Sequence, residues 1–81
     1  MRKIELNRIY RHFKGNYYYV KEIAISSETL EEYVVYQALY GDNKVYIRSL
    51  EMFLEAIDEK REDNITKQKY RFELANLEEE K

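Results

Sequence analysis

Residues 32–40 carry the strongest strand signal in the chain, Glu32-Tyr33-Val34-Val35-Tyr36-Gln37-Ala38-Leu39-Tyr40. Apolar and aromatic residues fill nearly every position, as in a strand that is covered on both faces or central to a barrel. Gly41-Asp42-Asn43 follows, and Gly and Asn tolerate the positive φ angles of tight turns. We therefore expect a hairpin here, whose second strand covers residues 44–48.

The segments on either side of this hairpin also alternate between strand and turn signals. Upstream, we expect a strand at Ile9–Phe13, a turn at 14–16 and a long strand at Tyr17–Ser26. Downstream, Leu50, Phe53, Leu54 and Ile57 recur at helical spacing, with Ser49 as N-cap, which predicts an amphipathic helix over residues 49–60. Near the end, Tyr70–Phe72 suggests a short strand, although residues 66–81 also fit a helix.

Together these elements predict a mainly β protein. About five strands with one short helix are typical of a small SH3-like β-barrel or a related β roll. The 81 residues are enough for a single domain, with a compact part at 8–74 and an acidic tail at 75–81.

The composition excludes several classes of protein. Without cysteine and with His12 as the one histidine, we expect neither disulfides nor a metal site, and no cofactor. No apolar run approaches the roughly 20 residues that cross a bilayer. The N-terminus lacks the apolar core of an export signal, so the expected location is cytoplasmic, without a membrane partner.

Charge is unevenly distributed along the chain. Residues 1–21 have a net charge of +5, residues 22–48 of −3 and residues 49–81 of −4. Such a polarised chain can attract a partner of opposite charge, or the basic start can lie against its own acidic end.

The expected hairpin registers place a polar row on one face of the sheet. An even-numbered loop would pair Tyr40 with Val45 and Gln37 with Arg48, and the preceding hairpin would set Glu22 beside Gln37. The row Glu22–Gln37–Arg48 would then lie opposite the core, flanked by Tyr18 and Tyr46. It is either a structural cross-strand salt bridge or a binding floor, because the guanidinium fork suits anions and base edges.

A second candidate is the segment 8–14 with Tyr17–Tyr19, where basic and aromatic residues interleave. Arg11, His12 and Lys14 belong to it, and this combination is found in proteins that bind single-stranded nucleic acid. Core packing is the competing explanation for most of its rings. His12 could also act as a general base, although no nucleophile motif accompanies it.

Several motifs together resemble a family of small bacterial proteins known only as a domain of unknown function. They are Tyr10-Arg11-His12-Phe13-Lys14-Gly15, Ser27-Glu28-Thr29 with Glu31, residues 34–41, Arg48, Met52-Phe53 and Arg71-Phe72. The resemblance covers about residues 8–72 and implies a compact β domain with no assigned activity. The chain departs from the family pattern at three positions: Tyr46, where Trp is usual, Ser49, where Pro is usual, and Glu22, where a small residue is usual. The connection formed by residues 59–69 is also longer than in the family pattern.

The sequence thus favours a non-enzymatic binding module for nucleic acid or a nucleotide-like anionic ligand. The candidate ligand-binding residues are Arg11, His12, Lys14, Tyr18, Gln37, Tyr46 and Arg48. The alternative is a protein–protein interaction domain that uses exposed tyrosines and the helix at 50–57. A third hypothesis is an enzyme that uses His12.

Overall fold

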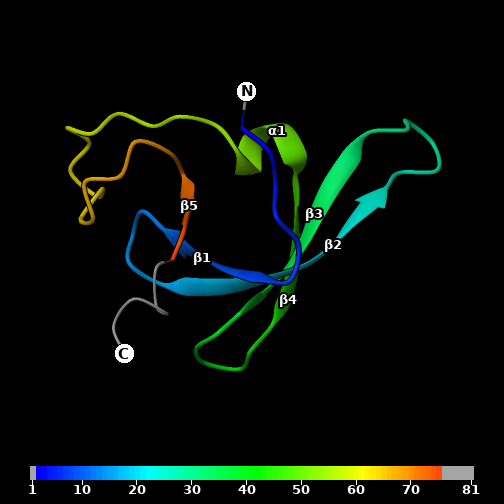
Figure 1. Cartoon of the computed structure of the whole chain (residues 1–81), viewed down its shortest axis with the longest axis horizontal. Coiled ribbons are helices and arrows are strands. Elements are labelled where there is room, and N and C mark those ends of the chain that lie inside the picture. The colour runs from blue at the N-terminus through cyan, green and yellow to red at the C-terminus, as the bar shows by residue number, and fades with distance from the viewer. Residues whose placement is uncertain (1, 76–81) are drawn as a thin grey trace.

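The computed structural model describes residues 2–75, which form one antiparallel sheet of five strands beside a single short helix (Figure 1). The elements are β1 (Arg8–His12), β2 (Tyr17–Ile25), β3 (Glu32–Ala38), β4 (Val45–Ser49), α1 (Leu50–Phe53) and β5 (Phe72–Leu74). The strand order is β4-β3-β2-β1-β5, and within the described residues the two edge strands do not pair with each other. The mainly β prediction is confirmed, but the sheet is open, and the predicted closure into an SH3-like barrel is not observed.

The helix is much shorter than the residues 49–60 predicted for it. Ser49 is its N-cap as expected, and its hydroxyl accepts a hydrogen bond from the Met52 amide at 3.2 Å. Beyond Phe53 the chain pairs with residues 69–71 instead, through backbone bonds from Ile57 to Lys69 and from Arg71 to Glu55. A helix of three turns is marginal on its own, so this tertiary pairing prevails over the helical pattern.

The core lies on one face of the sheet and is mostly aromatic. Phe53 of α1 stacks on Phe72 of β5 with ring centroids 4.0 Å apart, and Tyr10 and Tyr36 meet the Phe53 ring edge-on at 5.4 Å. Val20 and Val34 complete the buried cluster. Each fully buried side chain of this size contributes about 2–3 kcal/mol. The helix therefore covers one end of the sheet face, and we call this whole face the core face.

The connection between α1 and β5 is irregular but tightly bonded. Asn64 is fully buried, and its amide donates to the backbone carbonyls of Asp58 and Gln68 while its oxygen accepts from the Gln68 amide. Thr66 bonds the Phe13 carbonyl, which fastens the connection to the end of β1. Figure 1 shows this segment, coloured from yellow to orange, beside β5 and β1.

The fifth strand lies two residues later than the predicted Tyr70–Phe72. Tyr70 forms an isolated bridge with Ala56, and β5 pairs with β1 from Phe72 onward. The acidic tail expected at 75–81 lies, apart from Ala75, outside the described residues. No helix among residues 2–75 has the length and apolarity that crossing a membrane requires.

Candidate functional site

The register of the β3–β4 hairpin differs from the prediction and turns β4 over. Arg48 lies opposite Val34 and Tyr46 opposite Tyr36, so both side chains belong to the core face. Gln37 lies opposite Val45, on the reverse face. The expected pairing of Gln37 with Arg48, and the polar row Glu22–Gln37–Arg48 that depended on it, is therefore wrong.

The physical reason is an odd-numbered loop. Ala38 bonds back to Lys44, which leaves five residues, 39–43, in the turn. Gly41 and Asn43 both have positive φ, and the Asn43 side chain donates to the Ala38 carbonyl at 3.0 Å. A loop that holds one residue more than an even-numbered loop exchanges the two faces of the following strand.

A bulge in β2 likewise places Tyr18 on the core face. The register shifts between Val20 and Glu22, so Tyr18 and Val20 share the face of Ala38 and Tyr36 while Glu22 stays opposite Val35 on the reverse face. The sequence placed Tyr18 on the reverse face because it had no signal for the bulge. As a result Tyr18, Tyr46 and Arg48 remain together, but on the core face.

These residues gather at the end of the core face that α1 leaves open, around the buried ring of Phe72. His12 and Tyr18 meet the Phe72 ring edge-on at 4.9 and 5.6 Å. Tyr36 meets Tyr18 at 5.4 Å and Tyr46 at 5.9 Å. We call His12, Tyr18, Tyr36, Tyr46 and Arg48 the aromatic site. Tyr46 is 41% exposed, so the site opens to solvent at β4.

Arg48 is a half-buried cation that has no acidic partner among the described residues. Its Nε donates to the Tyr36 hydroxyl at 3.2 Å, and its guanidinium carbon lies 5.8 Å from the centroid of the Phe72 ring. The ion pairs among residues 2–75 join other side chains and leave Arg48 out. Its two terminal nitrogens have no hydrogen-bond partner within this part of the chain and could hold an anion.

His12 is held neutral in one tautomer. Its Nδ1 accepts a hydrogen bond from the Lys14 amide at 3.1 Å, so the proton of the neutral ring is on Nε2. Burial, followed by the positive charges of Arg48 and Arg71, lowers the pKa of His12 from 6.5 to about 4. The ring stacks on Phe13 with centroids 4.3 Å apart. At neutral pH this side chain offers an uncharged N–H donor beside Arg48.

Tyr40 extends the site, and the sequence did not single it out. Its hydroxyl lies 2.7 Å from that of Tyr18, and burial followed by this hydrogen bond raises the pKa of Tyr18. Tyr36 was likewise assigned to the core alone, although its hydroxyl orients Arg48. The usable signal for both was the run of tyrosines at 36, 40 and 46 around one turn.

The other three candidate residues lie elsewhere. Arg11 alternates with His12 onto the reverse face, where its guanidinium is 5.6 Å from the Tyr17 ring. Lys14 follows β1 and pairs with Asp63 at 3.8 Å. Gln37 donates to the Asn43 carbonyl at 2.9 Å and so supports the turn. Within residues 2–75 no group of His, Asp or Glu side chains is arranged to hold a metal ion.

Comparison with known proteins identifies the family but no activity. The sequence profile described as "Protein of unknown function (DUF1653)" matches residues 8–74. A crystal structure of a DUF1653 protein from Bordetella bronchiseptica is similar in fold, with a TM-score of 0.67 and 30% sequence identity, over 84% of this chain and 83% of that chain. No curated protein matches the sequence.

Proposed function

This chain belongs to the DUF1653 family of proteins of unknown function, and we propose that it is a binding module whose aromatic site takes a small, flat, anionic ligand. The anion would sit on Arg48, and a ring of the ligand would pack against the exposed face of Tyr46. Aromatic carboxylates and mononucleotides both have this chemistry.

The observation that carries the proposal is the guanidinium of Arg48, which has no ion pair with any residue from 2 to 75. A half-buried cation loses part of its hydration, and a protein usually compensates for this loss with a carboxylate. Here the Tyr36 hydroxyl is the one side-chain partner of Arg48 among the described residues. A planar fork that faces solvent between rings is suited to a bidentate carboxylate or phosphate.

The surrounding rings would add affinity and select for a flat ligand. A base or ring stacked on an aromatic side chain contributes about 1–3 kcal/mol. A hydrogen bond to a charged group adds about 1.5–3 kcal/mol. Together they give about 2.5–6 kcal/mol, which corresponds to a dissociation constant of about 0.04–15 mM. The uncharged Nε2–H of His12 would donate to the ligand without competing with Arg48 for the anion.

The distribution of cations favours a small ligand over a nucleic-acid strand. A strand needs a track of cations along its phosphates. Arg11 lies on the reverse face, whereas Lys14 and Arg71 are paired with Asp63 and Glu55. A single phosphate or carboxylate matches the Arg48 guanidinium, which forms no ion pair in the part of the chain that the structure describes.

The same geometry favours binding over catalysis by His12. A general base works best with a pKa near the operating pH. A histidine whose pKa is about 4 is a weak base at neutral pH, although it remains a good hydrogen-bond donor.

The test is an NMR titration at low salt with adenosine monophosphate, benzoate and an eight-nucleotide oligothymidylate. We expect the mononucleotide or benzoate to shift resonances of His12, Tyr18, Tyr46 and Arg48. Arg48→Gln should weaken this binding at least tenfold, whereas Arg11→Gln, which removes the same charge from the reverse face, should leave it unchanged. Both substitutions are at solvent-accessible positions, and thermal unfolding checks that both variants fold.

Two results would contradict the proposal. One is binding that Arg48→Gln and Arg11→Gln weaken equally, because it would reflect net charge and not the site. The other is binding of the oligonucleotide alone with a steep dependence on salt, which is typical of several phosphate contacts.

A further inference from the structure

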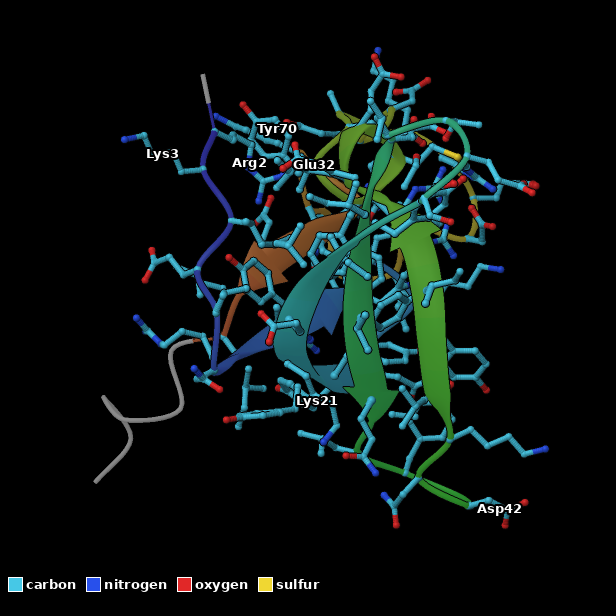
Figure 2. All side chains as sticks on the ribbon, turned by 90° about the vertical axis from the view of Figure 1, so that its right-hand side faces the viewer. Arg2, Lys3, Lys21, Glu32, Asp42 and Tyr70 are labelled. Atoms are coloured by element: carbon cyan, nitrogen blue, oxygen red, sulfur yellow. The ribbon has the colours of Figure 1, made fainter. Side chains whose placement is uncertain are left out.

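A second concave surface lies along α1, and none of the residues of the aromatic site lines it. It is a groove of about 710 Å³ between the start of β3, the helix and the N-terminal segment. Leu50, Leu54 and Tyr70 supply its apolar lining. Figure 2 shows Arg2, Glu32 and Tyr70 together at this end of the molecule, whereas Lys3 points away.

The N-terminal segment fixes one wall of the groove. The Arg2 guanidinium donates to the Leu54 carbonyl at 2.9 Å and to the Phe72 carbonyl at 2.7 Å, and it lies 4.1 Å above the Tyr70 ring. These contacts hold Tyr70 in place. They also direct the one cation of the lining toward backbone oxygens of the protein itself.

Carboxylates form the rim. Glu31, Glu32 and Glu51 line the groove and are exposed, and none of them takes part in an ion pair among residues 2–75. Three carboxylates against one guanidinium leave the groove negative. A negative rim around an apolar lining attracts a partner that is basic at its edges and apolar at its centre.

Two exposed apolar side chains are next to rim residues in the sequence. Leu30 directly precedes the rim residue Glu31, is 74% exposed and has a φ of 64°, which is an unfavourable backbone conformation for leucine. Met52 follows the rim residue Glu51 and is 45% exposed. Apolar side chains beside a polar rim are typical of protein interaction surfaces.

We propose that this acidic groove binds a short basic peptide segment of another protein. An apolar side chain of the segment lies between Leu50, Leu54 and Tyr70, and lysines or arginines on either side face Glu32 and Glu51. Charge complementarity determines the choice of occupant. The acidic residues Glu78–Glu80 of the chain's own end would be repelled by the rim, and a bare metal cation would leave the apolar lining uncovered.

The experiment is an NMR and fluorescence-anisotropy titration of the full chain with a labelled probe peptide, Lys-Lys-Leu-Phe-Lys-Lys. Two matched peptides accompany it: one with Ser-Ser in place of Leu-Phe and one with Glu in place of every Lys. We expect the probe to shift Leu50, Leu54 and Tyr70. We expect the Ser-Ser peptide to bind at least fivefold more weakly and the acidic peptide to leave these resonances unmoved.

A pair of charge reversals provides the control. Glu32→Lys at the rim should weaken probe binding at least fivefold. Glu59→Lys, an equal change of net charge at an exposed position outside the groove, should change it less than twofold. Arg48→Gln should have no effect, which separates this surface from the aromatic site.

Four results would overturn the inference. They are absence of shifts in the groove, equal loss in the two charge variants, equal binding of the Ser-Ser peptide, and groove shifts that appear on concentrating the protein without peptide. The last would assign the surface to a second copy of this chain.

Discussion

The ionisation of His12 gives a direct test of the packing at the aromatic site. The ring is half-buried between Phe13 and Phe72, with two arginines nearby, and these surroundings lower its pKa from 6.5 to about 4. In the unfolded chain the ring should titrate near its ordinary value. Between pH 6.5 and pH 4 the unfolded state therefore binds a proton that the folded state does not.

This difference makes folding less favourable as the pH falls. The stability associated with His12 is fully present above pH 6.5 and is lost progressively down to about pH 4. A depression of this size corresponds to at most about 3 kcal/mol at 1.36 kcal/mol per pKa unit. Because solvent screens a half-exposed ring, we expect about 1–2 kcal/mol.

The assay compares urea unfolding of the wild-type chain and His12→Asn at pH 7 and pH 4.5. Asparagine can still accept the Lys14 amide hydrogen bond, and both proteins contain the same carboxylates, so the comparison isolates the imidazole. From pH 7 to pH 4.5, the free energy of unfolding should fall by about 1–2 kcal/mol more in the wild type than in the variant. NMR gives the pKa directly, because the chain has one histidine and hence one set of imidazole signals.

Arg48→Gln should raise the pKa of His12, because the positive charge of Arg48 is the second cause of the depression after burial. A His12 that titrates between pH 6 and 7 would refute the reasoning. So would an equal pH dependence in the wild type and His12→Asn, since either result means that the ring is not packed as described.

Two further predictions concern stability and are measured by urea unfolding. Phe72→Ala removes the ring that stacks on Phe53 and should cost about 3–5 kcal/mol. The free energy of unfolding of a chain of this length is about 4–12 kcal/mol, so a large fraction of the variant molecules should be unfolded. A decrease in the free energy of unfolding of less than about 1 kcal/mol would contradict the described core. Asn64→Ala removes the side-chain donor of the Gln68 carbonyl, one of two donors of the Asp58 carbonyl and the acceptor of the Gln68 backbone amide, and should lower the free energy of unfolding by about 2–4 kcal/mol. Thr66→Val is the milder comparison, and an equal loss in both variants would be evidence against the central role of Asn64.

The sequence predicted the strands well because their signals are local. Aromatic and β-branched residues mark β2 and β3, and Gly15 and Gly41 mark turns that require positive φ. The helix was overextended because the periodicity at Ile57 does not reveal that residues 55–57 pair with 69–71. Such long-range pairing depends on contacts that no local pattern contains.

The sequence named four residues that the structure brings together, although through an incorrect register. His12, Tyr18, Tyr46 and Arg48 lie together, but on the face that was assigned to the core. Neither the bulge between Val20 and Glu22 nor the five-residue loop has a distinctive signature in the sequence. A side chain's face depends on the parity of such insertions, so an error of one residue changes every assignment downstream.

The length of the β3–β4 loop determines which side chains of β4 lie on the core face. With five residues in the loop, Tyr46 and Arg48 lie on the same face as Phe72, and Val45 and Ile47 lie on the reverse face. Loss of one loop residue would turn the edge strand over and offer two aliphatic side chains in place of a phenol and a guanidinium. A chain shortened by one residue between positions 39 and 43 would thus present an apolar instead of a charged surface beside Phe72, with every strand of the sheet retained.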